Sequence, residues 1–152
     1  MNNLWEKCQA WGRFVGKGVN VAIGVLCQRV LGRWSVLVAR RPAEGVLAGY
    51  WEFPGGKIES GEEPQEALRR EFQEELDLVV KVEGALRVVE HHYGHGHVRL
   101  HPFWCSLESG RPRNLQVVEH RWVWPQELAD FDLPAANGPL VEEVVEVLAG
   151  KV

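Results

Sequence analysis

A glycine-rich turn followed by an acidic amphipathic helix, at residues 55–78, constrains this chain more than any other feature. The segment reads GGKIESGEEPQEALRREFQEELDL. Its spacing predicts a helix over about residues 64–77, since proline is tolerated in a first turn and the apolar residues recur at helical intervals. Leu68, Phe72 and Leu76 form an i, i+4, i+8 stripe. One face of this helix is therefore expected to pack on a core.

The neighbouring face of the helix carries three carboxylates, from Glu71, Glu74 and Glu75. At 100° per residue they fall within an arc of about 100°. Like charges at this spacing repel, so the arrangement favours a cation between them. Carboxylate oxygens suit Mg²⁺, which is often shared with substrate phosphates. A solvated acidic face is the alternative, but the apolar stripe beside the acids indicates an ordered magnesium–phosphate site.

The chain has 152 residues, 45% of them hydrophobic and 25% charged, which is typical of one globular domain with a full core. Its formal net charge of −4 argues against binding to a nucleic-acid polymer, which would need a basic face. Cys8, Cys27 and Cys105 are widely spaced, so we expect reduced thiols. With no apolar stretch of membrane-spanning length and no visible secretory signal, we expect a cytoplasmic protein without membrane contact.

An N-terminal extension over residues 1–18 is expected to precede a single domain over residues 19–152. Four residues of the extension have helical spacing: Leu4, Trp5, Cys8 and Trp11. Contact with a membrane or a partner helix is one interpretation of this pattern. An extension that is mobile or packs on the domain is the better one.

Apolar, β-rich runs predict strands in five places: residues 19–27, 34–39, 80–92, 97–107 and 118–124. Residues 29–33 separate the first two strands like a hairpin turn. A short helix is expected from about Pro125, and a final helix over about residues 139–148. Strands before and between helices predict an α/β fold, with a mixed β-sheet flanked by helices.

The acidic segment resembles the Nudix box, Gly-x5-Glu-x7-Arg-Glu-U-x-Glu-Glu-x-Gly-U, in which U is apolar. Here the pattern runs from Gly56 through Glu62 to Arg70–Glu75 and matches at every fixed position but one. Asp77 stands in place of the second glycine. An aspartate can adopt the left-handed conformation of a helix terminus at a small cost in stability. The resemblance implies a Nudix-type α/β/α sandwich and a metal-dependent phosphohydrolase.

Two further stretches are similar to the MutT branch of this family. They are WEFPGGKIE at residues 51–59 and LPAAN at residues 133–137, and the likeness covers about residues 19–148. It implies hydrolysis of 8-oxo-dGTP to 8-oxo-dGMP and pyrophosphate, for nucleotide-pool sanitation and DNA replication fidelity. A CTP or 5-methyl-dCTP pyrophosphatase of the same family is the first alternative. A silent Nudix domain that binds a ligand or a protein is the second, although every box carboxylate is present.

The resemblance also implies the metal ligands and the catalytic residues. The ligands of Mg²⁺, for which Mn²⁺ can substitute, are Glu71, Glu75 and the backbone carbonyl of Gly55. Glu74 binds a second ion or helps to orient the site. Either Glu71 or Glu74 accepts the proton of the attacking water. Arg70 lies four residues before Glu74 and orients its carboxylate.

The same likeness implies a set of substrate-binding residues: Arg41, Phe53, Lys57, Tyr93 and Asn137. Arg41 and Lys57 contact the triphosphate charge. Phe53 and Tyr93 line the base pocket, or else they are ordinary packing aromatics. Asn137 recognises the oxidised base through an amide that both donates and accepts, and its place before the final helix also suits an N-cap. The expected partner is a small-molecule nucleoside triphosphate, bound by a monomer or a homodimer.

One position of the metal site departs from the family pattern. MutT-type enzymes supply a further metal carboxylate six residues before a strand tryptophan. Counting back from Trp122 gives Gln116, whose amide oxygen brings no charge. Glu119 is the alternative ligand if the loop is rearranged, and the assignment stays open between the two.

A cluster of histidines suggests a zinc site as another hypothesis: His91, His92, His95, His97 and His101. Three of them, His95, His97 and His101, would share one face of an extended strand. The cluster lies at a predicted hairpin, however, and no cysteine has matching spacing. Solvated polar side chains are therefore the favoured interpretation.

Overall fold

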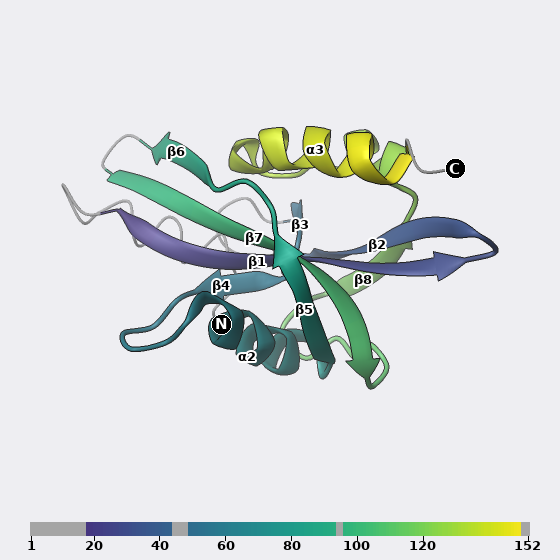
Figure 1. Ribbon diagram of the computed structural model, residues 1–152, viewed down its shortest axis with the longest axis horizontal. Helices are drawn as coiled ribbons and strands as arrows, with labels where there is room; N and C mark the ends of the chain where they lie inside the picture. The colour runs from purple at the N-terminus through teal and green to yellow at the C-terminus, as the bar shows by residue number, and fades with distance from the viewer. Residues whose placement is uncertain (1–17, 44–48, 94–95, 150–152) are drawn as a thin grey trace.

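An eight-stranded mixed sheet lies between two α-helices in the computed structural model of the chain (Figure 1). The structure describes residues 18–43, 49–93 and 96–149. Helix α2, Pro64–Leu76, covers one face of the sheet, and helix α3, Gly138–Ala149, covers the other. The predicted α/β/α arrangement is therefore confirmed.

Strand β1, Val19–Val30, pairs with three other strands of the sheet. It pairs in parallel with β7, Gly96–Ser109, along residues Val19 to Leu26. It pairs antiparallel with β2, Arg33–Arg40, and with the short β4, Gly55–Lys57. Through this pairing the predicted glycine turn becomes part of the sheet.

The remaining strands extend the two sides of β1. Strands β3, Trp51–Glu52, and β8, Glu119–Val123, pair with β2. Strands β5, Val79–Ala85, and β6, Val89–Tyr93, pair with β7. The sequence predicted one strand over 80–92, but the chain breaks there because β5 pairs with the second half of β7 and β6 with the first.

Two 3₁₀ helices connect β8 to α3: η1, Pro125–Asp130, and η2, Ala135–Asn137. The first is the short helix expected from Pro125. The proposed extension falls almost wholly on residues 1–17, which lie outside the described residues. None of the helices that the structure describes is both long enough and apolar enough to cross a bilayer.

Alternation along β1 divides the core into two clusters. Val21, Ile23 and Val25 belong to the cluster that includes α3, whereas Ala22 and Leu26 belong to the cluster that includes α2. Successive strand residues point to opposite faces, so one strand can supply both cores. The apolar stripe predicted for α2 is completely buried in the second cluster.

Asp77 caps the C-terminal end of α2, at the place where the box pattern predicted the helix to end. This residue adopts the left-handed conformation, with φ 56° and ψ 40°, and its backbone N–H donates to the carbonyl oxygens of Gln73 and Phe72. These bonds satisfy carbonyl groups that a helix end leaves open. The aspartate therefore takes the role of the glycine in the family pattern.

Helix α2 approaches the sheet closely at Gly24 of β1. A Cβ atom on Gly24 would lie 2.5 Å from Cε2 of Phe72 and 3.2 Å from Cδ1 of Leu68. A side chain at this position would push the helix, with its carboxylates, away from the sheet.

We expect Gly24→Ala to lower the free energy of unfolding by about 1–3 kcal/mol, because the added methyl overpacks the α2 interface. Urea denaturation measures the change. Gly84→Ala is the matched control, since a Cβ there would meet no atom within 4 Å. Equal effects of the two substitutions would show that α2 does not pack against Gly24.

Candidate active site

The end of α2 and the strand β4 bring two of the predicted metal-site residues into contact. The backbone N–H of Gly55 donates to Oε2 of Glu75 at 3.3 Å. Gly55 lies so close to β1 that a Cβ atom would collide with the carbonyl oxygen of Ala22. A glycine is therefore required for β4 to reach this position beside the helix.

The carboxylates of α2 differ in their exposure to solvent. Glu71 and Glu75 are buried, and Glu74 is partly exposed. Burying a carboxylate costs free energy unless hydrogen bonds or positive charge compensate it. The burial of two such groups in one helix therefore points to a specialised site rather than a solvated acidic face.

Arg70 holds the carboxylates together. Its Nε and Nη2 atoms donate to the two oxygens of Glu62 at 2.8 and 3.0 Å. Its Nη1 atom donates to Glu71 at 3.1 Å and to Glu74 at 3.4 Å. Its Nη2 atom also donates to the backbone carbonyl of Lys57, at 3.1 Å, and so ties the turn to the helix.

These contacts affect the ionisation of Arg70. The hydrogen bond to Glu62 is the largest cause of the raised pKa of Arg70. Burial lowers the pKa in part, and the negative charges of Glu71, Glu62 and Glu59 each raise it further. Arg70 therefore stays positively charged under all ordinary conditions. The sequence predicted its pairing with Glu74; its contacts with Glu62 and Glu71 were missed. A signal for the first contact existed, because Glu62 is itself a fixed position of the box.

Several acids share this one arginine, so the site is rich in negative charge. Glu59, Glu62, Glu71 and Glu74 all have an oxygen within 4.0 Å of its guanidinium. Such a surplus of hard oxygen donors fits Mg²⁺.

The described acidic side chains do not converge on a single metal position in this structure. Among the residues that the structure describes, no three acidic, histidine or cysteine side chains converge as metal ligands. Glu71 and Glu74 turn toward Arg70, and Glu75 turns toward Gly55. The donor chemistry fits the cation, and the assignment of individual ligands stays a prediction.

The structure places Gln116 beside the box helix. Its backbone N–H donates to the carbonyl oxygen of Glu75 at 3.2 Å, and its side-chain Oε1 is buried with no hydrogen-bond partner among the described residues. Glu119 lies in β8, where its carboxylate pairs with Arg40 at 3.1 Å and with Arg121 at 3.7 Å. Of the two candidates for the extra ligand position, Gln116 therefore contacts the helix of the site.

The predicted substrate-binding residues have different environments. Arg41 is completely buried just after β2, and its backbone N–H donates to the carbonyl oxygen of Tyr50 at 2.9 Å. Phe53 is completely buried in the core cluster that includes α3, so no part of its ring is exposed in this conformation. The side chain of Tyr93 lies outside the described residues.

Lys57 and Asn137 lie toward the α3 side of the sheet. Lys57 is exposed at the end of β4, opposite Val21, whose side chain faces α3. Asn137 is the last residue of η2 and is 2% exposed. Its Oδ1 atom has no hydrogen-bond partner in the described part of the chain, so this oxygen does not act as a helix cap.

The described histidines of the predicted cluster lie in strands β6 and β7. His92 and His97 lie opposite each other across the β6–β7 pair, with ring centroids 5.2 Å apart. The Nε2 atom of His101 lies 2.9 Å from Oδ1 of Asn20. The pKa of His101 is lowered, first by burial and then by the charge of Arg99. Another member of the predicted zinc cluster, His95, lies outside the described residues.

A family comparison agrees with this arrangement of box, sheet and helices. The model of the NUDIX domain matches residues 23–143. The chain belongs to the NUDIX family. The resemblance deduced from the acidic segment is therefore confirmed, and the chain is a Nudix hydrolase.

This Nudix hydrolase is similar to proteins with two different activities. The 8-oxo-dGTP diphosphatase of Proteus vulgaris is 39% identical over 84 residues, which are 55% of this chain and 72% of that protein. The CTP pyrophosphohydrolase of Escherichia coli is 33% identical over 120 residues, which are 77% of this chain and 87% of that protein. The solution structure of the E. coli ORF135 protein has a TM-score of 0.75 at 27% identity, covering 89% of this chain and 94% of that one.

We expect Arg70→Gln to lower the free energy of unfolding by about 2–3 kcal/mol in the presence of a chelator, because it leaves several like charges close together. Excess Mg²⁺ should recover part of the loss by binding to the folded state. Urea denaturation with and without Mg²⁺ measures both effects.

Arg113→Gln is the matched control, since its pair with Asp77 at 3.3 Å is exposed. Such a pair contributes less than about 1 kcal/mol. If Arg70→Gln is no more destabilising than Arg113→Gln, the guanidinium does not hold the carboxylates together.

Proposed function

We infer that this Nudix hydrolase cleaves 8-oxo-dGTP to 8-oxo-dGMP and pyrophosphate in a reaction that depends on Mg²⁺. Asn137 is the observation that carries the choice of substrate. It is a buried amide whose Oδ1 has no hydrogen-bond partner among the described residues. A buried acceptor in this state is costly, and a donor on a ligand would offset the cost. The N7–H of 8-oxoguanine is such a donor, whereas N7 of guanine only accepts.

Glu71, Glu74, Glu75 and the carbonyl of Gly55 are the proposed ligands of Mg²⁺, for which Mn²⁺ can substitute. When bound, the cation supplies positive charge at the phosphate oxygens and acidifies water. The hard oxygen donors beside β4, and the burial of two of them, support this assignment.

The side chains of the site have different roles in the proposed reaction. Arg70 orients Glu71 and Glu74 through its hydrogen bonds. One of these two carboxylates accepts a proton as water attacks the β-phosphorus. The bond from that phosphorus to the bridging oxygen breaks, and the oxygen stays on the monophosphate. Lys57 and Arg41 bind the triphosphate through their positive charge.

CTP is the second candidate substrate. The similarity of this chain to the E. coli CTP pyrophosphohydrolase supports this candidate. The cytosine base of CTP would place its amino group and ring nitrogen against Asn137. The two hypotheses predict opposite orders of kcat/KM for 8-oxo-dGTP and CTP, so an assay with a panel of nucleotides separates them.

We expect Glu71→Gln to reduce kcat by at least about a hundredfold, because the change keeps the shape of the side chain and removes its charge at the metal site. Pyrophosphate release measures the rate, and circular dichroism establishes that the variant is folded. Glu66→Gln, on the exposed first turn of the same helix, is the control and should leave the rate unchanged. Near wild-type turnover by folded Glu71→Gln would refute the metal assignment.

We expect wild type to prefer 8-oxo-dGTP to dGTP and CTP, and Asn137→Ala to remove much of that preference. A mismatched buried hydrogen bond costs about 1–3 kcal/mol, which corresponds to about 5- to 150-fold in kcat/KM. Asn137→Ala should therefore lower kcat/KM for 8-oxo-dGTP much more than for dGTP. Asn114→Ala, whose side chain bonds to His120 in an exposed position, serves as control.

Two results would contradict this proposal in different ways. Equal loss toward both purine nucleotides would show that Asn137 does not read the base. A higher kcat/KM for CTP than for 8-oxo-dGTP in the wild-type enzyme would make CTP the substrate.

A further inference from the structure

The turn between β1 and β2 exposes an apolar tip. Val30 pairs with Arg33, so Leu31 and Gly32 form a two-residue turn. Leu31 is 96% exposed and has a φ of 51°. Turns of this kind favour asparagine, aspartate or glycine at such a position, because a leucine is strained there. Folding therefore does not account for Leu31, and its exposure points to a contact with another molecule.

Two arginines flank this tip, and each lies over a tryptophan ring. The guanidinium carbon of Arg29 is 5.0 Å from the ring centroid of Trp34, and that of Arg33 is 4.0 Å from the ring centroid of Trp124. Neither arginine forms a salt bridge within the described residues. Stacking fixes the guanidinium groups and leaves their N–H edges available for carboxylates.

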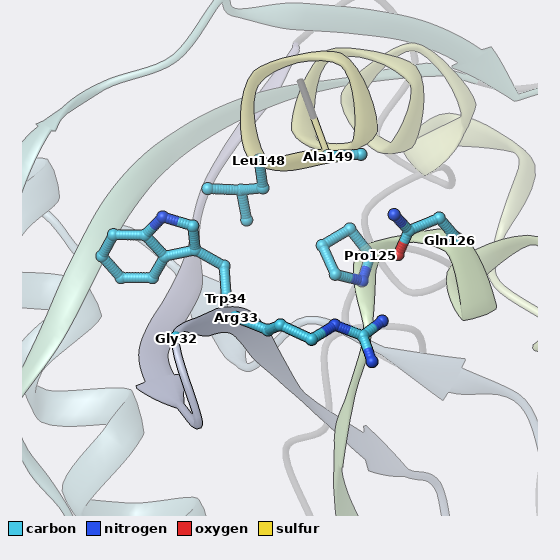
Figure 2. Close-up of a pocket in the computed structure, with 7 residues that line it drawn as sticks. All are labelled: Gly32, Arg33, Trp34, Pro125, Gln126, Leu148 and Ala149. Atoms are coloured by element: carbon cyan, nitrogen blue, oxygen red, sulfur yellow. The ribbon is translucent and has the colours of Figure 1, made fainter. Parts of the chain in front are cut away.

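The turn end of this hairpin, at residues 32–34, lies beside the C-terminal end of α3. Figure 2 shows Trp34 and Leu148 facing each other across a cavity of about 190 Å³, with Arg33 extended toward Pro125 and Gln126. The hairpin and α3 therefore border the same part of the molecule (Figure 1).

A second hollow, of about 360 Å³, lies along α3. It is lined by Arg87, Val89, Pro139, Glu142, Glu143, Glu146 and Val147. Its three carboxylates make no salt bridge within the described residues, and its apolar members supply a floor. Val88, another exposed apolar residue, directly precedes Val89 at its edge. We call this hollow the α3 groove.

We propose that the β1–β2 hairpin docks into the α3 groove of a second copy of this chain. The charges of the two surfaces are complementary, with arginines at the tip and carboxylates at the groove. Leu31 meets the apolar floor, and the N–H edges of Arg29 and Arg33 meet the glutamates. An anionic lipid surface is disfavoured as the partner, because the chain has a formal net charge of −4.

The two surfaces fit a closed dimer. Because both border α3, a two-fold axis beside this helix places the hairpin of each copy on the groove of the other. Each copy then uses one hairpin and one groove, and no binding surface is left over. Helix α2 covers the opposite face of the sheet, so this contact does not involve the proposed metal ligands on that helix.

Sedimentation velocity over about two decades of protein concentration tests the proposal. Wild type should form a reversible dimer, and Leu31→Asn should weaken it at least about tenfold. The asparagine suits the left-handed turn position, so the hairpin stays folded and only the apolar contact is lost. Val118→Asn, which removes an exposed apolar side chain elsewhere, is the matched control and should leave the dimer unchanged.

A pair of charge-reversed chains tests which surfaces meet. One carries Arg29→Glu with Arg33→Glu, and the other carries Glu142→Lys with Glu146→Lys. Each chain alone should be monomeric, because its hairpin and its groove then have the same charge. An equimolar mixture should form a heterodimer, since one contact is fully reversed and the other is wild type. Arg111→Glu, an exposed change outside both surfaces, is the control.

Several outcomes would overturn the proposal. They are a wild type that stays monomeric, a mixture of the reversed chains that stays monomeric, and open-ended growth beyond the dimer. A monomer that binds phosphatidylserine vesicles through Leu31 would make lipid the partner instead. A monomer that dimerises only after residues 1–17 are removed would make that segment the occupant of the groove.

Discussion

One guanidinium, that of Arg70, determines how the acidic groups of this protein are arranged. It hydrogen-bonds to Glu62 in the turn and to Glu71 and Glu74 in the helix, and its bond to the Lys57 carbonyl joins the turn to the helix. A lysine could not make these contacts together, because they use the planar fork of an arginine. Without this positive charge, the acids would repel one another at the distances observed.

Close packing brings this cluster to the sheet. Helix α2 packs against β1 at Gly24, and strand β4 packs against β1 at Gly55. A side chain at either glycine would collide with neighbouring atoms. The backbone N–H of Gly55 thereby reaches Glu75. Two buried carboxylates placed in this way favour a bound cation, and a cation bound there would favour a phosphate substrate.

Helix α3 belongs to or borders three different parts of the structure. Its apolar face completes one core cluster, the buried amide of Asn137 directly precedes it, and its acidic outer face forms the groove. A single helix therefore connects the stability of the sheet with the proposed choice of substrate and the proposed contact with a second copy. These roles use different faces of the helix, so they do not compete.

The sequence alone determined the elements whose pattern is local. The period of the apolar residues predicted α2, and the box pattern predicted the left-handed Asp77, because both depend on neighbouring residues. Only the tertiary structure decided that Arg70 also binds Glu62 and Glu71, that Phe53 is enclosed in the core, and that the segment 80–92 forms two strands. These features depend on the pairing of β7 with its neighbours and on the turn folding onto the helix. Such contacts join residues far apart in the chain, and no local periodicity encodes them.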